Sequence, residues 1–582
     1  MFLDAVRKDK ASATDGRDAI QERSADSTPS DTDKPGPSDQ EQEQEQIMLE
    51  EKEPAEPHFE RGLRFWAIIV VLGISGLLGS LEHTVVVTAG PYILQDLNMR
   101  EEFVWITNGF FVTSTAMTPL LGQLCNIFGR RWVFLTVIAF NTLGSGICGG
   151  ATSSDMLIAG RALQGAGSGG IVLIINIIVS DLCPLRHRGR YFAVILAIYG
   201  IGLATGPLIG GVVAEYSTWR WVFYLSLPIG GFSMISMFFL LRYDTIDNTT
   251  MGQKLRRLDI VGNLILAAST VSVLYSLTYA GTIYSWSSWH TLVPLLVGFL
   301  GFLIFGLYEA SGLPVEPVMP MRLLAHRTSI IVFINTWVNA CMYLWFLYFL
   351  PIYFQAVALY SATRAGYSLF PQAAAGAPAS IVAGLILSRW GKFKALHFAG
   401  FAFCAVGMGI TSLVDESTSI VHWAACQILV AIGVGVVVDT LPPAFQAPVS
   451  EDDQAAATSC WAFMRSFGGI WGVAIPAVVF NNRVDEMLTS TVSDPAARAL
   501  LGRGGAFQEA SANFVRQFAP DVQAEIRTLY ADALDRVFWV GAIFAVVGAL
   551  LCLIEKEVPM RLHLQTRYHL EKGEKTGHGH EA

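Results

Sequence analysis

Long apolar stretches dominate this sequence from Trp66 onward. Each is about 20 residues long, the length that an α-helix needs to cross a hydrocarbon core of ~30 Å. Helix is the expected state, because lipid offers no hydrogen-bond partners to an open strand edge. The sequence therefore predicts an all-α polytopic membrane protein with fourteen transmembrane helices. Their approximate ranges are 66–87, 104–124, 132–150, 156–179, 191–213, 221–241, 260–280, 291–310, 329–350, 366–387, 395–414, 422–443, 456–479 and 536–554.

The charged residues are few and unevenly distributed. They make up 15% of the 582 residues, against ~25% in soluble domains, so a soluble enzyme is not expected. The formal net charge of −9 comes from the N-terminal tail: residues 1–60 hold 7 basic and 17 acidic side chains, whereas the remainder holds 32 and 31. Because residues 1–60 are also poor in apolar side chains, they predict a disordered acidic tail.

Basic residues in short loops favour the cytoplasmic side of a membrane. With the N-terminus inside, the short outer loops carry three basic residues: Arg100, Arg220 and Arg364. The inner loops and the entry to the first helix carry sixteen, namely Arg61, Arg64, Arg130, Arg131, Arg186, Arg188, Arg190, Arg242, Lys254, Arg256, Arg257, Arg322, Arg327, Arg389, Lys392 and Lys394. One inner loop, around residues 451–453, is acidic. We therefore expect both termini in the cytoplasm.

Two distant segments of the chain are similar. Gly122 is followed seven residues later by Gly129 and a basic residue, and Gly384 is followed in the same way by Gly391 and Lys392. Helices one to six thus resemble helices nine to fourteen. Paired six-helix halves are common in secondary transporters, which place their substrate site near the bilayer midplane. The expected organisation is a tail at 1–60, an N-terminal half at 61–241, inserted helices seven and eight at 242–327, a C-terminal half at 328–555 with an external connection at 481–535, and a cytoplasmic tail at 556–582.

Four motifs make the chain resemble the major facilitator superfamily, and within it the fungal 14-helix drug:proton antiporters, which are toxin or multidrug efflux pumps. The resemblance covers about residues 62–555. The motif residues are Gly122, Asn126, Gly129, Arg130 and Arg131 after the second helix, Arg161, Gln164 and Gly165 in the fourth, Gly202, Gly206, Pro207, Gly210 and Gly211 in the fifth, and Trp219, Arg220 and Trp221 before the sixth.

The resemblance implies roles in gating for these motifs, and an antiporter for the motif of the fifth helix. Small residues four apart let helices approach closely, and Pro207 removes one backbone hydrogen bond. The resemblance adds that the Gly206–Pro207 region forms a tight interface between the halves. Asn126 stands where the family usually has Asp, so a latch based on charge is in doubt.

Glu82 is the leading candidate for proton coupling. A charge at mid-bilayer costs roughly 2.5–3.5 kcal/mol, so such residues default to functional candidates. A carboxyl group in a poorly hydrated cavity is more readily protonated than one in water. Glu82 is therefore expected to load and release a proton; the alternative is a buried acid held by a fixed partner.

Three further charges lie within predicted spans. Arg161 stays protonated and is expected to favour proton release from a nearby carboxylate, unless it reaches the interface. Asp439 is a second proton site, a contact for a cationic substrate, or a residue in water at the inner end of its helix. Arg465 is either a counter-charge or a side chain that reaches the cytoplasmic interface.

These observations predict a proton-coupled transporter that exports small amphipathic organic compounds, such as drugs, toxins or secondary metabolites, by alternating access. We expect a plasma-membrane monomer in the lipid bilayer, without cofactor, metal or nucleic acid; the vacuolar membrane is the alternative location. The alternative function is a carrier of siderophores or basic amino acids with the same fold. A sensor or scaffold that has lost transport is another alternative. It is disfavoured because such a protein need not keep charged residues in its membrane spans. An enzyme would need a nucleophile and base cluster, and the sequence shows none.

Overall fold

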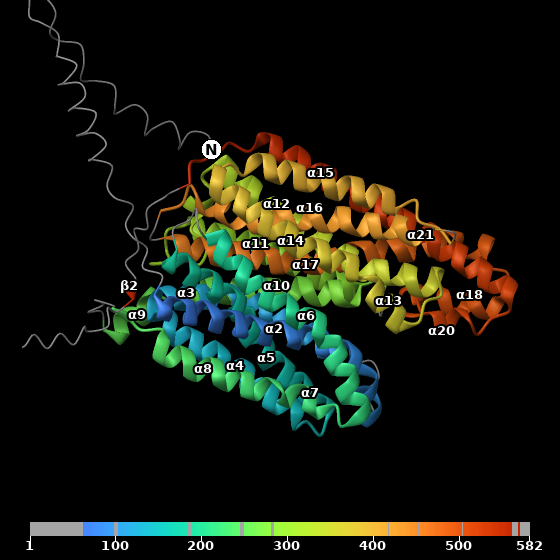
Figure 1. Ribbon diagram of the computed structural model, residues 1–582, viewed down its shortest axis with the longest axis horizontal. Coiled ribbons are helices and arrows are strands. Elements are labelled where there is room, and N and C mark those ends of the chain that lie inside the picture. Colours follow the sequence, from blue (N-terminus) through green and yellow to red (C-terminus); the bar gives the residue numbers. More distant parts are fainter. Residues whose placement is uncertain are drawn as a thin grey trace, which may run out of the picture. The chain divides into compact units, whose positions relative to one another are not determined.

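The computed structural model describes residues 62–97, 103–183, 188–244, 250–280, 284–416, 418–450, 453–502, 504–560 and 569–570. The tail expected at 1–60 and most of that at 556–582 lie outside these residues. The first described helices are α2 (Leu63–Asp96), α3 (Phe103–Phe128), α4 (Arg130–Gly149), α5 (Ser154–Leu182), α6 (Arg188–Tyr216), α7 (Arg220–Tyr224) and α8 (Ser226–Leu240) (Figure 1).

The middle of the chain contains α9 (Met251–Arg257), α10 (Ile260–Tyr279), α11 (Trp289–Ala310) and the short helix η2 (Met321–Leu324). The remaining helices are α12 (Arg327–Ile352), η3 (Tyr353–Val357), α13 (Ala362–Ser368), α14 (Phe370–Trp390), α15 (Lys394–Thr411), α16 (Ile420–Gln446), α17 (Gln454–Thr491), α18 (Pro495–Leu501), α19 (Gly505–Gln508), α20 (Ala512–Val515) and α21 (Pro520–Ile554). Two short strands, β1 (Tyr243–Asp244) and β2 (His569–Leu570), pair antiparallel.

The all-helical membrane fold predicted from the sequence is confirmed. Each of the fourteen predicted stretches coincides with one helix or with two consecutive helices. Twelve described spans are long and apolar enough to cross a bilayer, and α3 and α6 are not among them. The number fourteen therefore remains a prediction.

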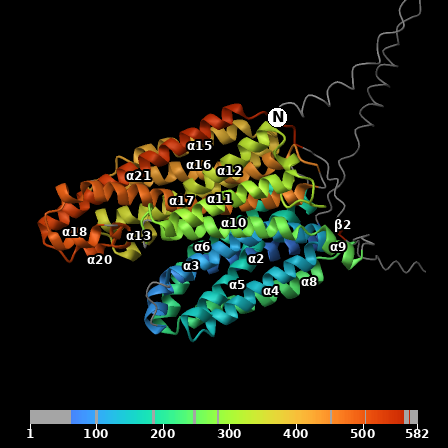
Figure 2. The ribbon, with the colours of Figure 1, turned by 180° about the vertical axis from the view of Figure 1, so that it is seen from behind.

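The helices pack as two bundles with matching internal contacts (Figures 1 and 2). In the first, α2 packs on α6, α5 lies against both α3 and α4, and α4 contacts α8. In the second, α12 packs on α17, α16 lies against both α14 and α15, and α15 contacts α21. The same pairing in both halves is the structural counterpart of the repeat seen in the sequence.

The inserted helices α10 and α11 contact both halves. Gln123 of α3 accepts a hydrogen bond from Asn263 Nδ2 at 2.8 Å and donates one to the Glu316 carbonyl at 2.7 Å. On the other side, Phe302 of α11 packs on Phe467 of α17, with ring centroids 5.4 Å apart. Helices α10 and α11 therefore cover the contact between α3 and α17.

Residues 481–535, expected as an external connection, are helical over most of their length. α17 continues to Thr491, three short helices follow, and α21 begins at Pro520. Apolar side chains such as Leu488, Val515 and Leu529 are buried there. Arg527 donates to the Val357 carbonyl at 2.7 Å, which joins α21 to η3. Charged residues between these apolar positions explain why no long hydrophobic run marks the helices in the sequence.

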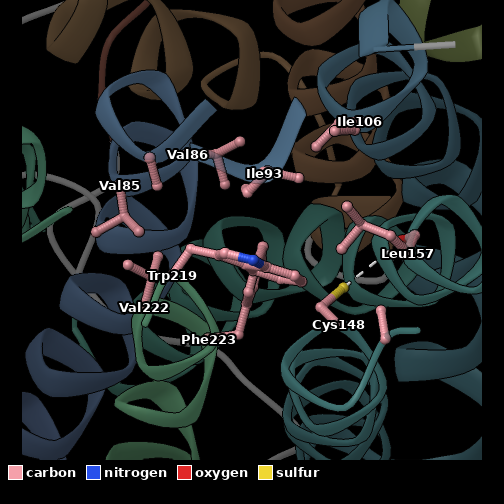
Figure 3. Packing of buried hydrophobic residues seen from close by; sticks show 11 residues of the cluster. Val85, Val86, Ile93, Ile106, Cys148, Leu157, Trp219, Val222 and Phe223 are labelled. Carbon is pink, nitrogen blue, oxygen red and sulfur yellow. Dashed lines mark hydrogen bonds between the residues drawn. The ribbon is translucent and has the colours of Figure 1, made fainter. Parts of the chain in front are cut away.

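The motif before the sixth predicted span closes one end of the first bundle. Trp219 lies in an apolar cluster with Val85, Val86 and Phe223 (Figure 3). At the end of α2, Asp96 accepts hydrogen bonds from Trp219 Nε1 and from Arg220, both at 2.9 Å. The Trp219 indole N–H and the Arg220 guanidinium hold the pKa of Asp96 below its usual range.

We predict that Asp96→Asn lowers the thermal midpoint of the purified protein at neutral pH. Because the native pKa of Asp96 is lowered, its stabilising contribution is present above the ordinary aspartate pKa of ~3.9 and is lost as the pH falls through the native value. The difference between wild type and variant should therefore shrink on acidification. A difference that stays constant, or grows, toward low pH would contradict this assignment.

Candidate functional site

Glu82 is buried inside the N-terminal half. Its Oε1 atom accepts hydrogen bonds from Asn141 Nδ2 at 2.9 Å and from Ser145 Oγ at 2.8 Å, both on α4. Its Oε2 atom receives no hydrogen bond from any described residue. The carboxyl group is therefore solvated by the protein on one side, and the side chain is 4% exposed.

A chain of neutral groups connects Glu82 to Arg161. Gln164 Nε2 donates to Ser145 Oγ at 2.8 Å, and Arg161 donates to Gln164 Oε1. Arg161 also donates to the Ile106 carbonyl at 2.8 Å and lies over the Phe110 ring, 4.3 Å from its centroid. It is 2% exposed, so it does not extend to a membrane interface. Among the described residues, Glu82 and Arg161 form no ion pair.

A small cavity of about 100 Å³ lies beside Glu82. Apolar side chains of α2, α6, α7 and α8 make up most of its wall, among them Val86, Ile209 and Phe223. The groups found around Glu82 therefore all belong to its own half of the protein. The neighbouring His83 instead packs against Phe110, with ring centroids 4.8 Å apart.

The other two charges lie in the C-terminal half. Ser380 of α14 donates a hydrogen bond to Asp439 of α16. Asp439 lies seven residues before the end of α16, about 10 Å along the helix axis. Arg465 lies eleven residues inside α17, or about 16 Å. Both side chains are half-buried.

The first motif forms a loop held by hydrogen bonds and an ion pair. Gly129 has a positive φ of 86° and precedes α4. Arg130 pairs with Asp181 at the end of α5 at 2.7 Å and donates to the Cys125 carbonyl at 2.9 Å. Arg131 donates to the Phe238 carbonyl at 2.6 Å, at the end of α8. The basic residues therefore join the ends of helices within one half.

Gly122 of the same motif makes a close contact between the halves. A Cβ atom at this position would collide with the side chain of Ser459 on α17. Ser459 Oγ lies 3.5 Å from the Pro119 carbonyl, to which it donates. The seam between α3 and α17 is thus closed at this level by close packing of small residues.

The glycines of the fifth predicted span pack α6 against α2. A side chain at Gly202 would collide with Ser80, and one at Gly206 with Thr84. These contacts lie within the N-terminal half, on either side of Glu82 in the α2 sequence. Pro207, Gly210 and Gly211 belong to the same helix, and α6 also contacts α14 of the other half.

Several residues of this site carry no signal in the sequence. Asn141 and Ser145 lie 59 and 63 residues from Glu82 in the chain, and isolated Asn and Ser residues within spans are common. Ser459 is a similar case. Gln164 and Gly165 stand in a motif, and a side chain at Gly165 would collide with Phe110 and Thr113 of α3.

Two repeated helical halves with long apolar helices are the architecture of many multi-pass membrane transporters. A family model described as the Major Facilitator Superfamily matches residues 72–473. The chain belongs to this superfamily. Its fold is similar to the solved structure of the proton:xylose symporter XylE, with a TM-score of 0.53 over 84% of this chain and 95% of that chain, at 11% identity.

Curated fungal relatives cover most of the chain. It is 50% identical over 523 residues to the MFS-type transporter TwmF of Talaromyces wortmannii, which covers 90% of this chain and 94% of TwmF. It is 41% identical over 514 residues to the MFS efflux transporter aclA of Aspergillus oryzae, which covers 88% and 93% of the two chains. The protein is therefore a transporter and not an enzyme.

We predict that Ser145→Ala lowers the free energy of unfolding by about 1–3 kcal/mol, because it removes one of the two hydrogen bonds to Glu82 Oε1 and the acceptor of the Gln164 amide. The matched control is Ser75→Ala: Ser75 is buried in α2 and bonds to the Val71 carbonyl of its own helix. Unfolding of the purified variants measures both changes. Equal losses in the two variants would show that Ser145 does not link the network.

We also predict that Gly122→Ala impairs transport and costs about 1–3 kcal/mol, since overpacking forces neighbours apart. Ser459→Gly should restore function in the double variant, because the nearest remaining atom, the Ser459 Cα, lies 3.6 Å from the added methyl group. Uptake assays of both variants provide the test. Failure of the second substitution to rescue the first would contradict the assigned contact.

Proposed function

We propose that this protein is a proton-coupled exporter of small amphipathic organic compounds, that it works by alternating access in the plasma membrane, and that both termini are cytoplasmic. Export is supported by the relatives, one of which is named an efflux transporter. Proton coupling is supported by the surroundings of Glu82. Localisation of a fluorescent fusion distinguishes the plasma membrane from the vacuolar one.

The observation that carries the proposal is the asymmetric solvation of the Glu82 carboxyl group. Oε1 accepts two hydrogen bonds and Oε2 accepts none from the described residues, and no basic side chain among those residues forms an ion pair with either oxygen. An ion-paired acid would be held in its charged form. A buried acid with one uncommitted oxygen is suited instead to exist with and without a proton.

Ser145 is the group that responds to that proton. Its hydroxyl lies 2.8 Å from both Glu82 Oε1 and the Asn141 carbonyl, and it accepts a hydrogen bond from Gln164. A single hydroxyl hydrogen serves one acceptor at a time. The Ser145 hydrogen is therefore drawn to ionised Glu82 and is released to the Asn141 carbonyl when Glu82 is protonated. Arg161 acts on this exchange through Gln164.

A mechanical route leads from Glu82 to the other half. Ser80 and Thr84 flank Glu82 on α2 and contact the glycines of α6. α6 in turn packs on α14. A small rotation of α2 that accompanies proton loading therefore changes the position of a helix that lies on the seam. Opening between α3 and α17 requires Gly122 and Ser459 to separate.

We expect Glu82→Gln to reduce gradient-driven transport below about a tenth of the wild-type rate, a loss typical of an essential acid–base group. The assay uses inside-out vesicles with an imposed proton gradient. The probes are three dansyl-labelled undecyl compounds of one skeleton, ending in a methyl ester, a carboxylic acid or an amine. Internal fluorescence reports probe uptake, and a pH-sensitive dye reports proton release.

The matched control is Glu309→Gln. Like Glu82, Glu309 is buried, but it lies at the end of α11. It accepts hydrogen bonds from the backbone N–H groups of Val318 and Met319 and does not contact the Glu82 network. This variant should keep gradient-driven transport. Probe uptake by the wild type that does not depend on the gradient would overturn proton coupling, and normal coupling in Glu82→Gln would overturn the site.

A further inference from the structure

The cavity of about 100 Å³ beside Glu82 has one hydroxyl group in its wall. Among the described residues that line it, Ser226 at the start of α8 is the single polar side chain other than Glu82. Ser226 is 4% exposed, and no hydrogen bond joins its hydroxyl group to another described residue. Because buried hydroxyl groups normally have a partner, Ser226 offers a vacant hydrogen-bonding position inside the N-terminal half.

The rest of the cavity wall is apolar. Val85, Val86, Val222 and Phe223 belong to the cluster around Trp219 (Figure 3), and the other lining residues are Leu and Ile residues on α2, on α6 and at the start of α8. A water molecule needs two or more polar partners, so a cavity of this kind is a poor water site. Its surroundings oppose a carboxylate ion strongly and a neutral carboxyl group much less.

Glu82 therefore lies between two settings of opposite character. On one side, Asn141 Nδ2 and Ser145 Oγ donate to Oε1 at 2.9 and 2.8 Å, which suits an ionised carboxyl group. In this position Oε2 has no partner among the described residues, so a proton bound to Oε2 would be a donor without an acceptor. On the other side, the Ser226 hydroxyl group can accept that hydrogen bond.

We propose that the Glu82 side chain has two positions: ionised, on Asn141 and Ser145, and protonated, in the cavity, where its O–H group donates to Ser226. A change of side-chain rotamer connects the two positions, and the cavity is larger than the ~30 Å³ that one water molecule occupies in the liquid. Ser226 is then a positioning residue for the proton. The inference rests on the proton coupling proposed above.

The proposed movement has a consequence for the helices. Both hydrogen bonds of Glu82 Oε1 join α2 to α4, and both are lost when the side chain turns into the cavity. The new hydrogen bond joins α2 to α8 instead. Proton loading therefore exchanges one helix partner of α2 for another within the same bundle, which supplies a cause for the rotation of α2.

The test is infrared difference spectroscopy of the purified full chain in nanodiscs, in which a step to acidic pH adds the carbonyl band of protonated carboxyl groups. The band that Glu82→Gln removes belongs to Glu82, and its position reports the hydrogen bonds of that carboxyl group. Ser226→Ala should move this band to higher wavenumber, whereas Ser226→Thr, which keeps the hydroxyl group, should leave it in place. Ser145→Ala should also leave it in place, because protonated Glu82 no longer contacts Ser145.

Transport provides a second measurement. In the vesicle assay, Ser226→Ala should lower gradient-driven uptake of the methyl ester about two- to tenfold, the effect of losing one neutral hydrogen bond. Val222→Phe fills the cavity and should lower uptake further, since it confines Glu82 to its first position. The matched control is Ser233→Ala: Ser233 is buried on the same helix but does not line the cavity, and this variant should keep both the band and the rate.

Two outcomes overturn the inference. One is a band shift in Ser145→Ala that equals or exceeds the shift in Ser226→Ala, and the other is a band that moves in neither variant. The proposed function fails separately. If the band responds to Ser226 but uptake does not depend on the gradient, the two positions stand and proton-coupled export is wrong. If coupled uptake requires Glu82 but the band responds only to Ser145, the exporter stands and the second position is wrong.

Discussion

A charge inside a membrane protein has to be solvated by the protein itself, and the chain of hydrogen bonds from Glu82 to Arg161 performs this task. It draws its groups from α2, α4 and α5, so it fixes the relative positions of three helices. The side chains involved are short, and they meet only if the helix backbones are close. A side chain at Gly144 would collide with the backbone of Gln164, and one at Gly167 with that of Asn141. The glycines of α4 and α5 are therefore a condition for the polar network.

The two halves use opposite charges in different ways. In the N-terminal half, the acid and the base are buried and bound by neutral partners of the same bundle, a setting suited to exchange of a proton without a ligand. In the C-terminal half, Asp439 accepts a hydrogen bond from Ser380, and Arg465 lies 5.6 Å from the centre of the Trp461 ring without a hydrogen bond or ion pair to another described residue.

Much of the architecture could be predicted from the sequence, because a membrane span needs a long apolar run and the motif glycines keep a fixed spacing. The direction in which the Glu82 side chain points could not be predicted from the sequence. It depends on the rotation of α2, which is set by the contacts of Ser80 and Thr84 with α6 and is not visible in an apolar helix. The partners of Glu82 lie about 60 residues away and are ordinary Asn and Ser residues. The helices within residues 481–535 were not predicted, because their apolar residues alternate with charged ones and form no long apolar run.

The first motif has Asn126 where an acid is usual in the family, which bears on how α3 and α17 are held together. Arg130, the basic residue of that loop, pairs with Asp181 of α5 and therefore does not depend on an acid at position 126. One contact across the seam is the packing of Gly122 on Ser459. Packing forces act over a short range, so the two surfaces lose their attraction after a small displacement. Separation of the halves at this contact then depends on the shape of the two packed surfaces.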